Sequence, residues 1–251
     1  MGQKKLIKFN AIKTFDNVME YPQDMKGKWK AHFEQQVGNK DHPGELTLEL
    51  ACGKGEYAVG LARLYPTQNF IGIDVKGNRI WKGASIAIKD QLKNVGFVRS
   101  QMDQVTNYFD KDEVSEIWIT FPDPQLRLSK AKKRLTHPKF LRLYQQFLKP
   151  GGIVNLKTDS PNLYHFTLKV IELFNLDLVY HTDNLYAQAK IDPRCEIKTY
   201  YESLNIAGSN CIHYIQFKID KPLPIEKDEL IKDLIADIPM DKGNYAESEE
   251  G

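Results

Sequence analysis

The regular alternation of short β-rich runs with longer helical segments constrains this chain more than any other sequence feature. Between Leu46 and Ile219, runs rich in β-branched and aromatic residues alternate with stretches of helical periodicity. This alternation is typical of a doubly wound sheet, in which parallel strands carry helices on both faces. We therefore predict an α/β fold with a seven-stranded, mostly parallel sheet.

The strand and helix boundaries follow from this pattern and from turn signals such as Pro150-Gly151 and Ser160-Pro161. The predicted strands are 46–50, 69–74, 95–100, 116–120, 152–158, 177–182 and 211–219. The predicted helices are 55–64, 78–93, 139–148 and 160–174. No convincing helical segment separates the last two strands, which predicts an antiparallel pair at one edge of the sheet.

Charge divides the chain into three predicted regions. Residues 1–40 contain eight Lys and four acids and are interpreted as a basic N-terminal arm that packs on the body, residues 41–220 as the main domain, and residues 221–251 as a short helix at 227–235 followed by an acidic, mobile end. The net charge of +2 hides a balance of −6 over residues 226–251 and +8 over the rest. That excess favours a polyanionic partner, although a solvated basic surface is the alternative.

Several classes of protein are excluded by composition. No stretch approaches the roughly 18 consecutive apolar residues that a membrane span needs, and the first ten residues lack the apolar core of a secretion signal, so we expect a cytoplasmic protein without membrane contact. The three cysteines, Cys52, Cys195 and Cys211, are too few and too scattered for a disulfide framework or a paired zinc site. We expect no bound metal, and the oligomeric state is left open.

A candidate nucleotide site lies where the first predicted strand ends. Gly53 and Gly55 allow a tight turn that a ligand can approach, and Asp74 closes the next strand, 19 residues after Gly55. Its carboxylate can accept hydrogen bonds from both hydroxyls of a ribose. Ala58 stands at the third glycine position of the dinucleotide fingerprint, so this pattern fits NAD as well as S-adenosylmethionine.

Two acidic residues favour S-adenosylmethionine. Glu49 lies inside an otherwise apolar strand, where a buried carboxylate needs a partner that the ammonium group of a methionine moiety could provide. A Lys or backbone N–H groups of the protein are the alternative partners. Asp123 lies between two prolines just beyond the fourth strand, at the edge where ligands of open α/β sheets gather.

With these motifs in order, residues 46–202 resemble the bacterial tRNA (guanine-N7-)-methyltransferase family. Glu49 with Gly53-Lys54-Gly55 looks like its acidic-x-Gly-x-Gly motif, and Asp74 stands where the family usually has Glu. The resemblance implies a Rossmann-like, S-adenosylmethionine-dependent methyltransferase fold. It implies an enzyme that methylates guanine N7 at position 46 of the tRNA variable loop. The cofactor contacts implied for S-adenosyl-L-methionine are Glu49, Gly53, Gly55, Asp74, Asp103 and Asp123.

The resemblance also implies a substrate site. Asp123 matches the supposed catalytic Asp of the family's Asp-Pro-Trp-Pro motif, and the substrate-binding residues carried over are Arg127, Asp159, Thr199, Tyr200, Tyr201 and Glu202. The chain departs from the family at the Trp, where it has Gln125, and in the Lys-Lys-Arg-His run that follows. Arg127 takes the place of the first Lys of that run. The residues expected on RNA phosphates are Lys130, Lys132, Lys133 and Arg134.

The charge pattern agrees with an RNA substrate. Between Asp123 and Asp159 there are nine basic residues and no acid, which suits phosphates of a folded RNA; an exposed lysine-rich face is the alternative. We expect tRNA rather than DNA as the partner. Three other functions stay open: methylation of an exocyclic amine, a non-catalytic RNA-binding module with a decayed site, and an NAD enzyme.

Overall fold

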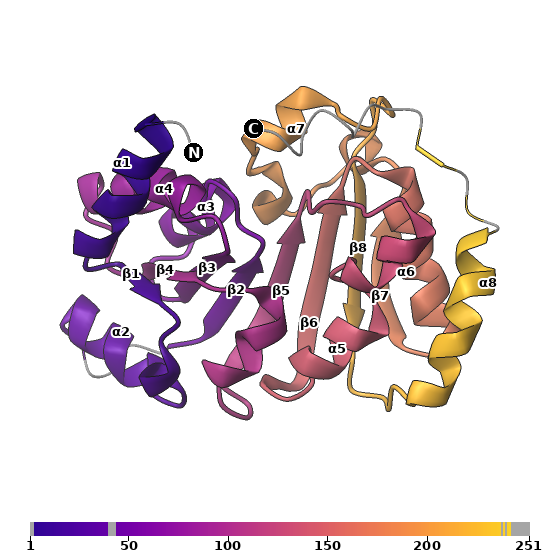
Figure 1. The fold of residues 1–251 in the computed structure, drawn as a ribbon, viewed down its shortest axis with the longest axis horizontal. Helices are drawn as coiled ribbons and strands as arrows, with labels where there is room; N and C mark the ends of the chain where they lie inside the picture. The colour runs from indigo at the N-terminus through magenta and orange to yellow at the C-terminus, as the bar shows by residue number, and fades with distance from the viewer. Residues whose placement is uncertain (1–2, 40–43, 237, 239, 242–251) are drawn as a thin grey trace. The chain divides into compact units, whose positions relative to one another are not determined.

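The computed structural model describes residues 3–39, 44–236, 238 and 240–241, and the chain forms two compact units. The first unit comprises residues 1–120 and 146–150, and the second comprises residues 121–145 and 151–251. The ribbon is drawn in Figure 1. The acidic end predicted to be mobile falls almost entirely in 242–251, outside the described residues, as do residues 1, 2 and 40 of the predicted arm.

The helices and strands are bounded as follows. The α-helices are α1 Gln3–Ala11, α2 Trp29–Val37, α3 Glu56–Leu64, α4 Gly77–Lys89, α5 Pro138–Tyr144, α6 Pro161–Leu173, α7 Tyr200–Leu204 and α8 Ile231–Ala236. The strands are β1 Val18–Glu20, β2 Leu46–Leu50, β3 Asn69–Asp74, β4 Val95–Arg99, β5 Val114–Thr120, β6 Leu148–Thr158, β7 Asp177–Thr182 and β8 His213–Lys218.

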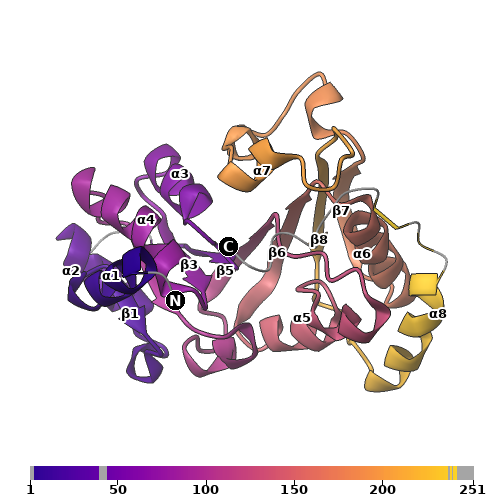
Figure 2. The same ribbon diagram turned by 45° about the horizontal axis from the view of Figure 1, so that its top comes forward.

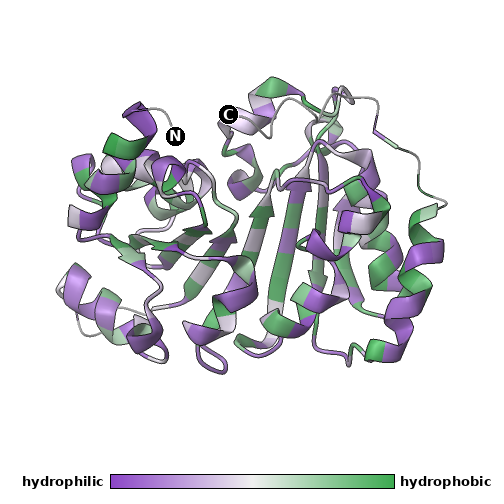
Figure 3. Cartoon of the chain, viewed as in Figure 1, coloured by the Kyte–Doolittle hydropathy of each residue, from purple (hydrophilic) through white to green (hydrophobic). Residues whose placement is uncertain are grey.

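The first unit is built on parallel strands in the order β1-β4-β3-β2-β5. Leu48 of β2 lies opposite Ile71 of β3 on one side and Ile117 of β5 on the other. Every residue of β2 and β3 is buried, because helices cover both faces of a parallel sheet and leave no wet face. The strands are accordingly mostly hydrophobic in Figure 3, whereas the helices alternate in hydropathy.

Strand β1 was not expected. Its three residues pair with Phe97, Val98 and Arg99 at the outer edge of β4. The same N-terminal segment forms α1, which packs on α4, and buries Ile12 completely. A strand of three residues is too short for period-two alternation to reveal it.

The second unit confirms the predicted antiparallel edge. Strand β8 pairs antiparallel with both β6 and β7, giving the order β6-β8-β7. Helix α6 begins where Ser160 caps it and Pro161 follows, and α5 begins where Nδ1 of His137 accepts a hydrogen bond from Lys139 N. Figure 2 shows α7 in the connection between β7 and β8, apart from α6.

The predicted fold class is confirmed, with eight strands in the described residues instead of seven because of β1. The predicted helix at 227–235 is divided into a 3₁₀ segment, Ile225–Leu230, and the short α8. Among the described residues, none of the helices is long and apolar enough to cross a membrane.

Candidate active site

The turn between β2 and α3 depends on two glycines in left-handed conformations. Gly53 has φ 55° and Gly55 has φ 67°, and Gly55 caps α3. A Cβ on Gly55 would lie 2.4 Å from the buried ring of Phe97, so only glycine fits there. The turn is tied to the next strand because Cys52 N donates to Ile73 O at 2.9 Å. This brings the backbone N–H groups at the start of α3 close to the end of β3.

Glu49 is 2% exposed and is satisfied inside the first unit. One carboxyl oxygen accepts from Ala58 N at 2.8 Å, and the other accepts from Thr120 Oγ1 at 2.8 Å. Burial raises the pKa of this carboxyl to about 8, so it is mainly protonated at neutral pH. Glu49 therefore ties α3 to β2 and β5, which agrees with the alternative that its partners are protein groups.

Asp74 holds the glycine turn from the end of β3. Its Oδ2 accepts from Gly53 N at 2.9 Å and its Oδ1 accepts from Lys76 N at 2.7 Å. The residue is 7% exposed, and burial raises the pKa of its carboxyl group. Each oxygen keeps a lone pair for a further donor. The two carboxylate oxygens of Asp74 can therefore accept further hydrogen bonds beside the turn.

Asp103 is exposed in the 3₁₀ segment Met102–Asn107 that follows β4. The backbone joins this region to the end of β3, since Ser100 N donates to Asp74 O at 3.1 Å. The first unit therefore brings Glu49, Gly53, Gly55 and Asp74 to one turn, with Asp103 on the loop after the neighbouring strand.

Asp123 lies in the second unit on a loop with unusual backbone geometry. Phe121 (φ 47°) and Gln125 (φ 48°) both adopt left-handed conformations, which non-glycine residues avoid. Pro122 and Pro124 are buried, whereas Asp123 is exposed. Its Oδ1 accepts from Gln125 N at 2.9 Å. The loop thus holds the carboxylate of Asp123 toward solvent on a fixed backbone.

Arg134 holds the Asp123 loop by hydrogen bonds from the protein interior. It is fully buried, and its guanidinium donates to Gln125 O at 3.3 Å and to Asn162 Oδ1 at 2.8 Å, while it stacks on the ring of Phe166. Its burial does not support the expected contact between Arg134 and an RNA phosphate. Gln125, at the family's Trp position, is held through its backbone carbonyl.

The other residues expected to contact RNA are more accessible. Arg127, Lys132 and Lys133 are exposed, and Lys130 is half-buried, around the 3₁₀ segment Leu128–Lys133. Several of the nine basic residues have acidic partners from elsewhere in the chain. Arg142 pairs with Asp228, and Lys149 pairs with Glu45. Counting charges along the sequence therefore overstated the uncompensated charge of this segment.

Lys157 differs from the other basic residues of this segment. It was one of the nine basic residues, yet its side chain is fully buried in β6. The ammonium donates to Cys195 O at 2.7 Å, Ile197 O at 3.0 Å and Glu202 Oε2 at 3.0 Å, and Tyr186 binds the same carboxylate. The position of Lys157 inside the predicted strand 152–158 was the sequence signal that could have indicated its burial.

Of the remaining predicted substrate residues, Thr199, Tyr200 and Tyr201 lie at α7 beside Glu202, and Asp159 follows β6. Thr199 Oγ1 accepts from Glu202 N and so caps α7, on which Tyr200 is exposed and Tyr201 half-buried. Asp159 is 7% exposed, and its Oδ2 accepts from Ala207 N at 3.1 Å. Burial raises the pKa of Asp159. The second unit thus gathers the predicted residues into two groups, Asp123 with Arg127 on one loop and Glu202 with Thr199 at α7.

The described residues contain no cluster of metal-ligating side chains. No group of three His, Cys, Asp or Glu side chains there could hold a metal ion.

Comparison with known proteins defines the class. The profile of a family described as "Putative methyltransferase" matches residues 43–212. The crystal structure of the 16S rRNA methyltransferase KamB superposes with a TM-score of 0.55 at 15% identity, over 76% of this chain and 94% of that chain. The chain is therefore a methyltransferase of the α/β class.

Relatives in sequence define the family more closely. The tRNA (guanine-N(7)-)-methyltransferase of Bacteroides thetaiotaomicron is 44% identical over 227 residues, 87% of each chain. The enzyme of the same name from Christiangramia forsetii is 41% identical over 230 residues, covering 87% of this chain and all of that one. This chain belongs to the tRNA (guanine-N(7)-)-methyltransferase family.

Proposed function

We propose that this protein transfers the methyl group of S-adenosylmethionine to N7 of a guanine in tRNA, at position 46 of the variable loop. The observation that carries the proposal is the identity of 41–44% with tRNA (guanine-N(7)-)-methyltransferases over 87% of the chain. The glycine turn and the Asp123 loop lie within the matched region. A tRNA substrate also fits a cytoplasmic site of action.

The first unit fits the cofactor. The turn at Gly53 and Gly55 presents backbone without side chains, in a left-handed conformation that favours glycine. We assign the ribose hydroxyls to the carboxylate edge of Asp74, with Asp103 as a second acid on the neighbouring loop. Glu49 supports the turn from inside through Ala58 N. S-adenosylmethionine supplies an electrophilic methyl group on a sulfonium centre.

Methyl transfer to guanine N7 does not require a general base. N7 carries an in-plane lone pair and no proton, so alignment is the main task of the protein. Positioning alone can lower the barrier by roughly 7 kcal/mol or more. Rigid side chains that orient the purine are therefore the expected machinery.

Asp123 is the residue we assign to this role. Its exposed carboxylate can accept hydrogen bonds from N1–H and the exocyclic amino group of guanine, and it offers negative charge as the purine becomes cationic. Arg127, four residues later and exposed, lies on the same loop. Asp159 is assigned a positioning role, because its carboxylate holds Ala207 N.

RNA docking is assigned to the exposed cations of the second unit. Lys132 and Lys133, with Lys130, can neutralise phosphates. The buried guanidinium of Arg134 instead positions the Asp123 loop through Gln125 O. Thr199, Tyr200, Tyr201 and Glu202 are assigned to the tRNA side, with the aromatic rings exposed or half-exposed on α7.

One experiment tests the reaction and its position together. Unmodified tRNA is incubated with the protein and methyl-labelled S-adenosylmethionine, and N7-methylguanosine is mapped by borohydride reduction and aniline cleavage. We expect a single cleavage in the variable loop. Label on an exocyclic amine would show a different methyltransferase, and tRNA binding without any transfer would show an RNA-binding module. The Asp123→Ala protein, which keeps the cofactor unit intact, is the matched control.

A further inference from the structure

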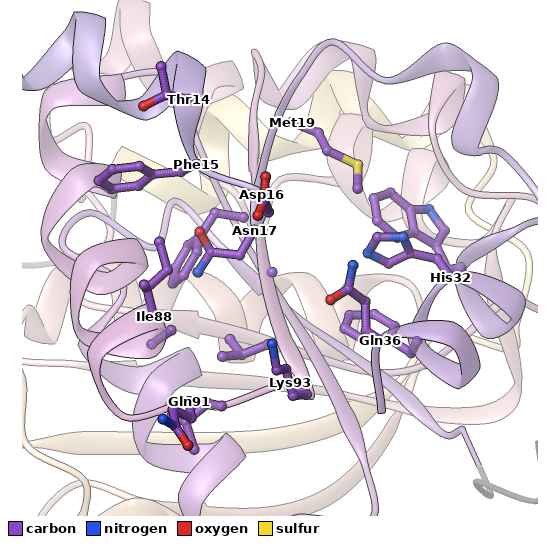
Figure 4. A pocket seen from close by; sticks show the side chains of 17 residues that line it. Thr14, Phe15, Asp16, Asn17, Met19, His32, Gln36, Ile88, Gln91 and Lys93 are labelled. Carbon is purple, nitrogen blue, oxygen red and sulfur yellow. The ribbon is translucent and has the colours of Figure 1, made fainter. Parts of the chain in front are cut away.

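The first unit contains a cavity that the proposed reaction does not use. It has a volume of about 420 Å³ and lies at the outer edge of β4, between α2 and α4 (Figure 4). Binding sites for small molecules commonly measure roughly 300–1,000 Å³. None of the glycine-turn residues Gly53, Gly55 and Asp74 lines it.

The cavity exists because β1 does not extend along the first two residues of β4. Val18, the first residue of β1, lies opposite Phe97, so β4 continues by two residues beyond its partner. Asn17 supplies the last contact, since its carbonyl oxygen accepts from Phe97 N at 2.8 Å. Val95 and Gly96 therefore line a notch at the sheet edge.

The backbone of Val95 faces this notch. Phe70 N of β3 donates to Asn94 O at 2.9 Å, and Phe97 N bonds on the opposite side to Asn17. Because alternate residues of a strand bond to opposite neighbours, the N–H and C=O of Val95 point to the same side as those of Phe97. Within residues 3–39 and 44–236, no strand residue lies opposite them there. The cavity thus offers a backbone donor and acceptor side by side.

Polar side chains extend this pair. His32 and Gln36 of α2 lie on one side of the cavity, and Asn17 lies near its centre in Figure 4. Oδ1 of Asn17 is buried and has no hydrogen-bond partner among the described residues. Burial lowers the pKa of His32, so its imidazole is neutral at pH 7 and can both donate and accept.

The shape favours a flat ligand. Trp29 and Phe33, each 2% exposed, form an apolar wall, and Gly96 leaves the strand surface open because it has no side chain. Lys93 and Asp16 are the charged residues of the lining, and both are exposed. A long apolar ligand would leave the buried backbone N–H and C=O of Val95 unsatisfied.

We propose that this cavity binds a nucleobase. A planar heterocycle with an adjacent donor and acceptor matches the N–H and C=O of Val95, and the amide of Gln36 suits the same edges. Two sources share this chemistry, an unpaired base of the RNA substrate and a free nucleoside. The first source rests on the proposed function, whereas the second does not.

Two variants test the site, each checked for folding by thermal unfolding and for S-adenosylmethionine affinity. Gly96→Val fills the notch, and its Cβ is tolerated because it would lie 3.7 Å from Asn17 O and 4.0 Å from Phe33 Cζ. Gln36→Ala removes a polar group from the lining. Gln35→Ala is the matched control, since Gln35 is exposed on the same helix and does not line the cavity.

The measurements are nucleoside binding and tRNA crosslinking. Adenosine, guanosine, cytidine and uridine are titrated separately and followed by calorimetry and ligand-observed NMR. Unmodified tRNA is crosslinked by ultraviolet light, and nucleotide-bearing peptides are identified by mass spectrometry. We expect binding of at least one nucleoside, or a crosslink within 29–36 or 87–97. Gly96→Val should weaken the interaction by roughly tenfold or more, Gln36→Ala by less, and Gln35→Ala not at all.

The outcomes separate the two sources and the two proposals. A crosslink that Gly96→Val abolishes identifies a base of the RNA, and nucleoside binding with unchanged tRNA affinity identifies a free ligand. No nucleoside binding and no crosslink in these peptides, while N7-methylguanosine still forms, would overturn the inference and leave the proposed function intact. Nucleoside binding without any methyl transfer would support the inference and count against the proposed function.

Discussion

The turn after β2 and the loop after β5 both carry acidic residues on left-handed backbone, but they use them differently. In the turn, Ala51, Gly53 and Gly55 have positive φ, and the carboxyl groups of Glu49 and Asp74 are buried and accept hydrogen bonds from backbone N–H groups. In the loop, Phe121 and Gln125 have positive φ, and Asp123 is exposed. In the turn, the acidic residues hold the backbone in its conformation, whereas in the loop one acidic residue faces solvent.

This difference separates residues that build a site from residues that act in it. A family motif contains both kinds, and the sequence does not distinguish them. Burial distinguishes most of them: Glu49, Arg134, Lys157 and Asp159 are buried and hold neighbouring backbone, whereas Asp123 is exposed. Asp74 is buried as well, and we assign it to the cofactor because its oxygens keep lone pairs for further donors. Each prediction below tests whether a residue belongs to the group that the structure gives it.

The largest expected effect is on folding of the second unit. Lys157→Met should lower the free energy of unfolding by about 3–5 kcal/mol, because it leaves the carboxylate of Glu202 buried without its cation. Urea titration measures this change. The double variant Lys157→Met, Glu202→Leu should recover part of the loss. A single variant as stable as the parent would show that Lys157 is not a supporting residue.

Asp123→Ala should lower the rate of methyl transfer by about 10²–10³-fold, the range seen when one group that stabilises developing charge is removed. Cofactor affinity should stay within twofold, because the role that we assign to Asp123 is on the guanine. Asp123→Asn keeps an acceptor for Gln125 N and serves as the control for loop shape. A loss of cofactor affinity equal to the loss of rate would move Asp123 into the cofactor pocket.

Glu49 should make stability depend on pH. Its pKa is raised to about 8 in the folded protein, so the folded state holds a proton that the unfolded chain has released above its ordinary pKa of 4.5. Stability from this group is therefore full at acid pH and falls as pH rises from about 5 to 8, by about 1 kcal/mol per pH unit. Glu49→Gln should flatten that part of the curve, measured as Tm against pH. Parallel curves for the two proteins would contradict the burial argument.

Asp74→Ala should weaken S-adenosylmethionine binding by roughly 10- to 100-fold, because hydrogen bonds to a charged acceptor contribute about 1.5–3 kcal/mol. Part of the loss would come from the turn itself, since Gly53 N loses its acceptor. Asp74→Asn, which retains an acceptor for that N–H, isolates the contribution of charge. Calorimetry on folded variants with parental affinity would remove Asp74 from the site.

The smallest effect is expected from the exposed cations. Replacing Lys132 and Lys133 by Gln should flatten the plot of log K for tRNA binding against log salt by about 1–1.5 units, at roughly 0.7 per contact. Cofactor affinity should not change. Arg134→Lys provides the contrast, because a buried residue should alter rate and stability but not this slope. An unchanged slope in the double variant would show that these two lysines are exposed to solvent and do not contact RNA phosphates.

Much of the fold followed from the sequence because its signals are local. Apolar runs and the signals at Ser160-Pro161 and Pro150-Gly151 place most strands and helices to within a few residues. The pairing of Lys157 with Glu202, 45 residues apart, and of Arg142 with Asp228, 86 residues apart, is not local, so charge counting misassigned both cations. The same holds for Arg134, whose burial depends on Asn162 and Phe166 of α6.

The proposed division of roles, with Asp74 on the cofactor and Asp123 on the guanine, is tested most directly by single-turnover methylation of tRNA at increasing S-adenosylmethionine concentration. The measurement is made on Asp74→Ala and Asp123→Ala side by side. Saturating cofactor should restore the rate of Asp74→Ala to within a few-fold of the parent, because only binding is impaired. The same concentration should leave Asp123→Ala at least a hundredfold slow. A rate of Asp123→Ala that rises to the parental value at high cofactor, or one of Asp74→Ala that does not, would contradict the division.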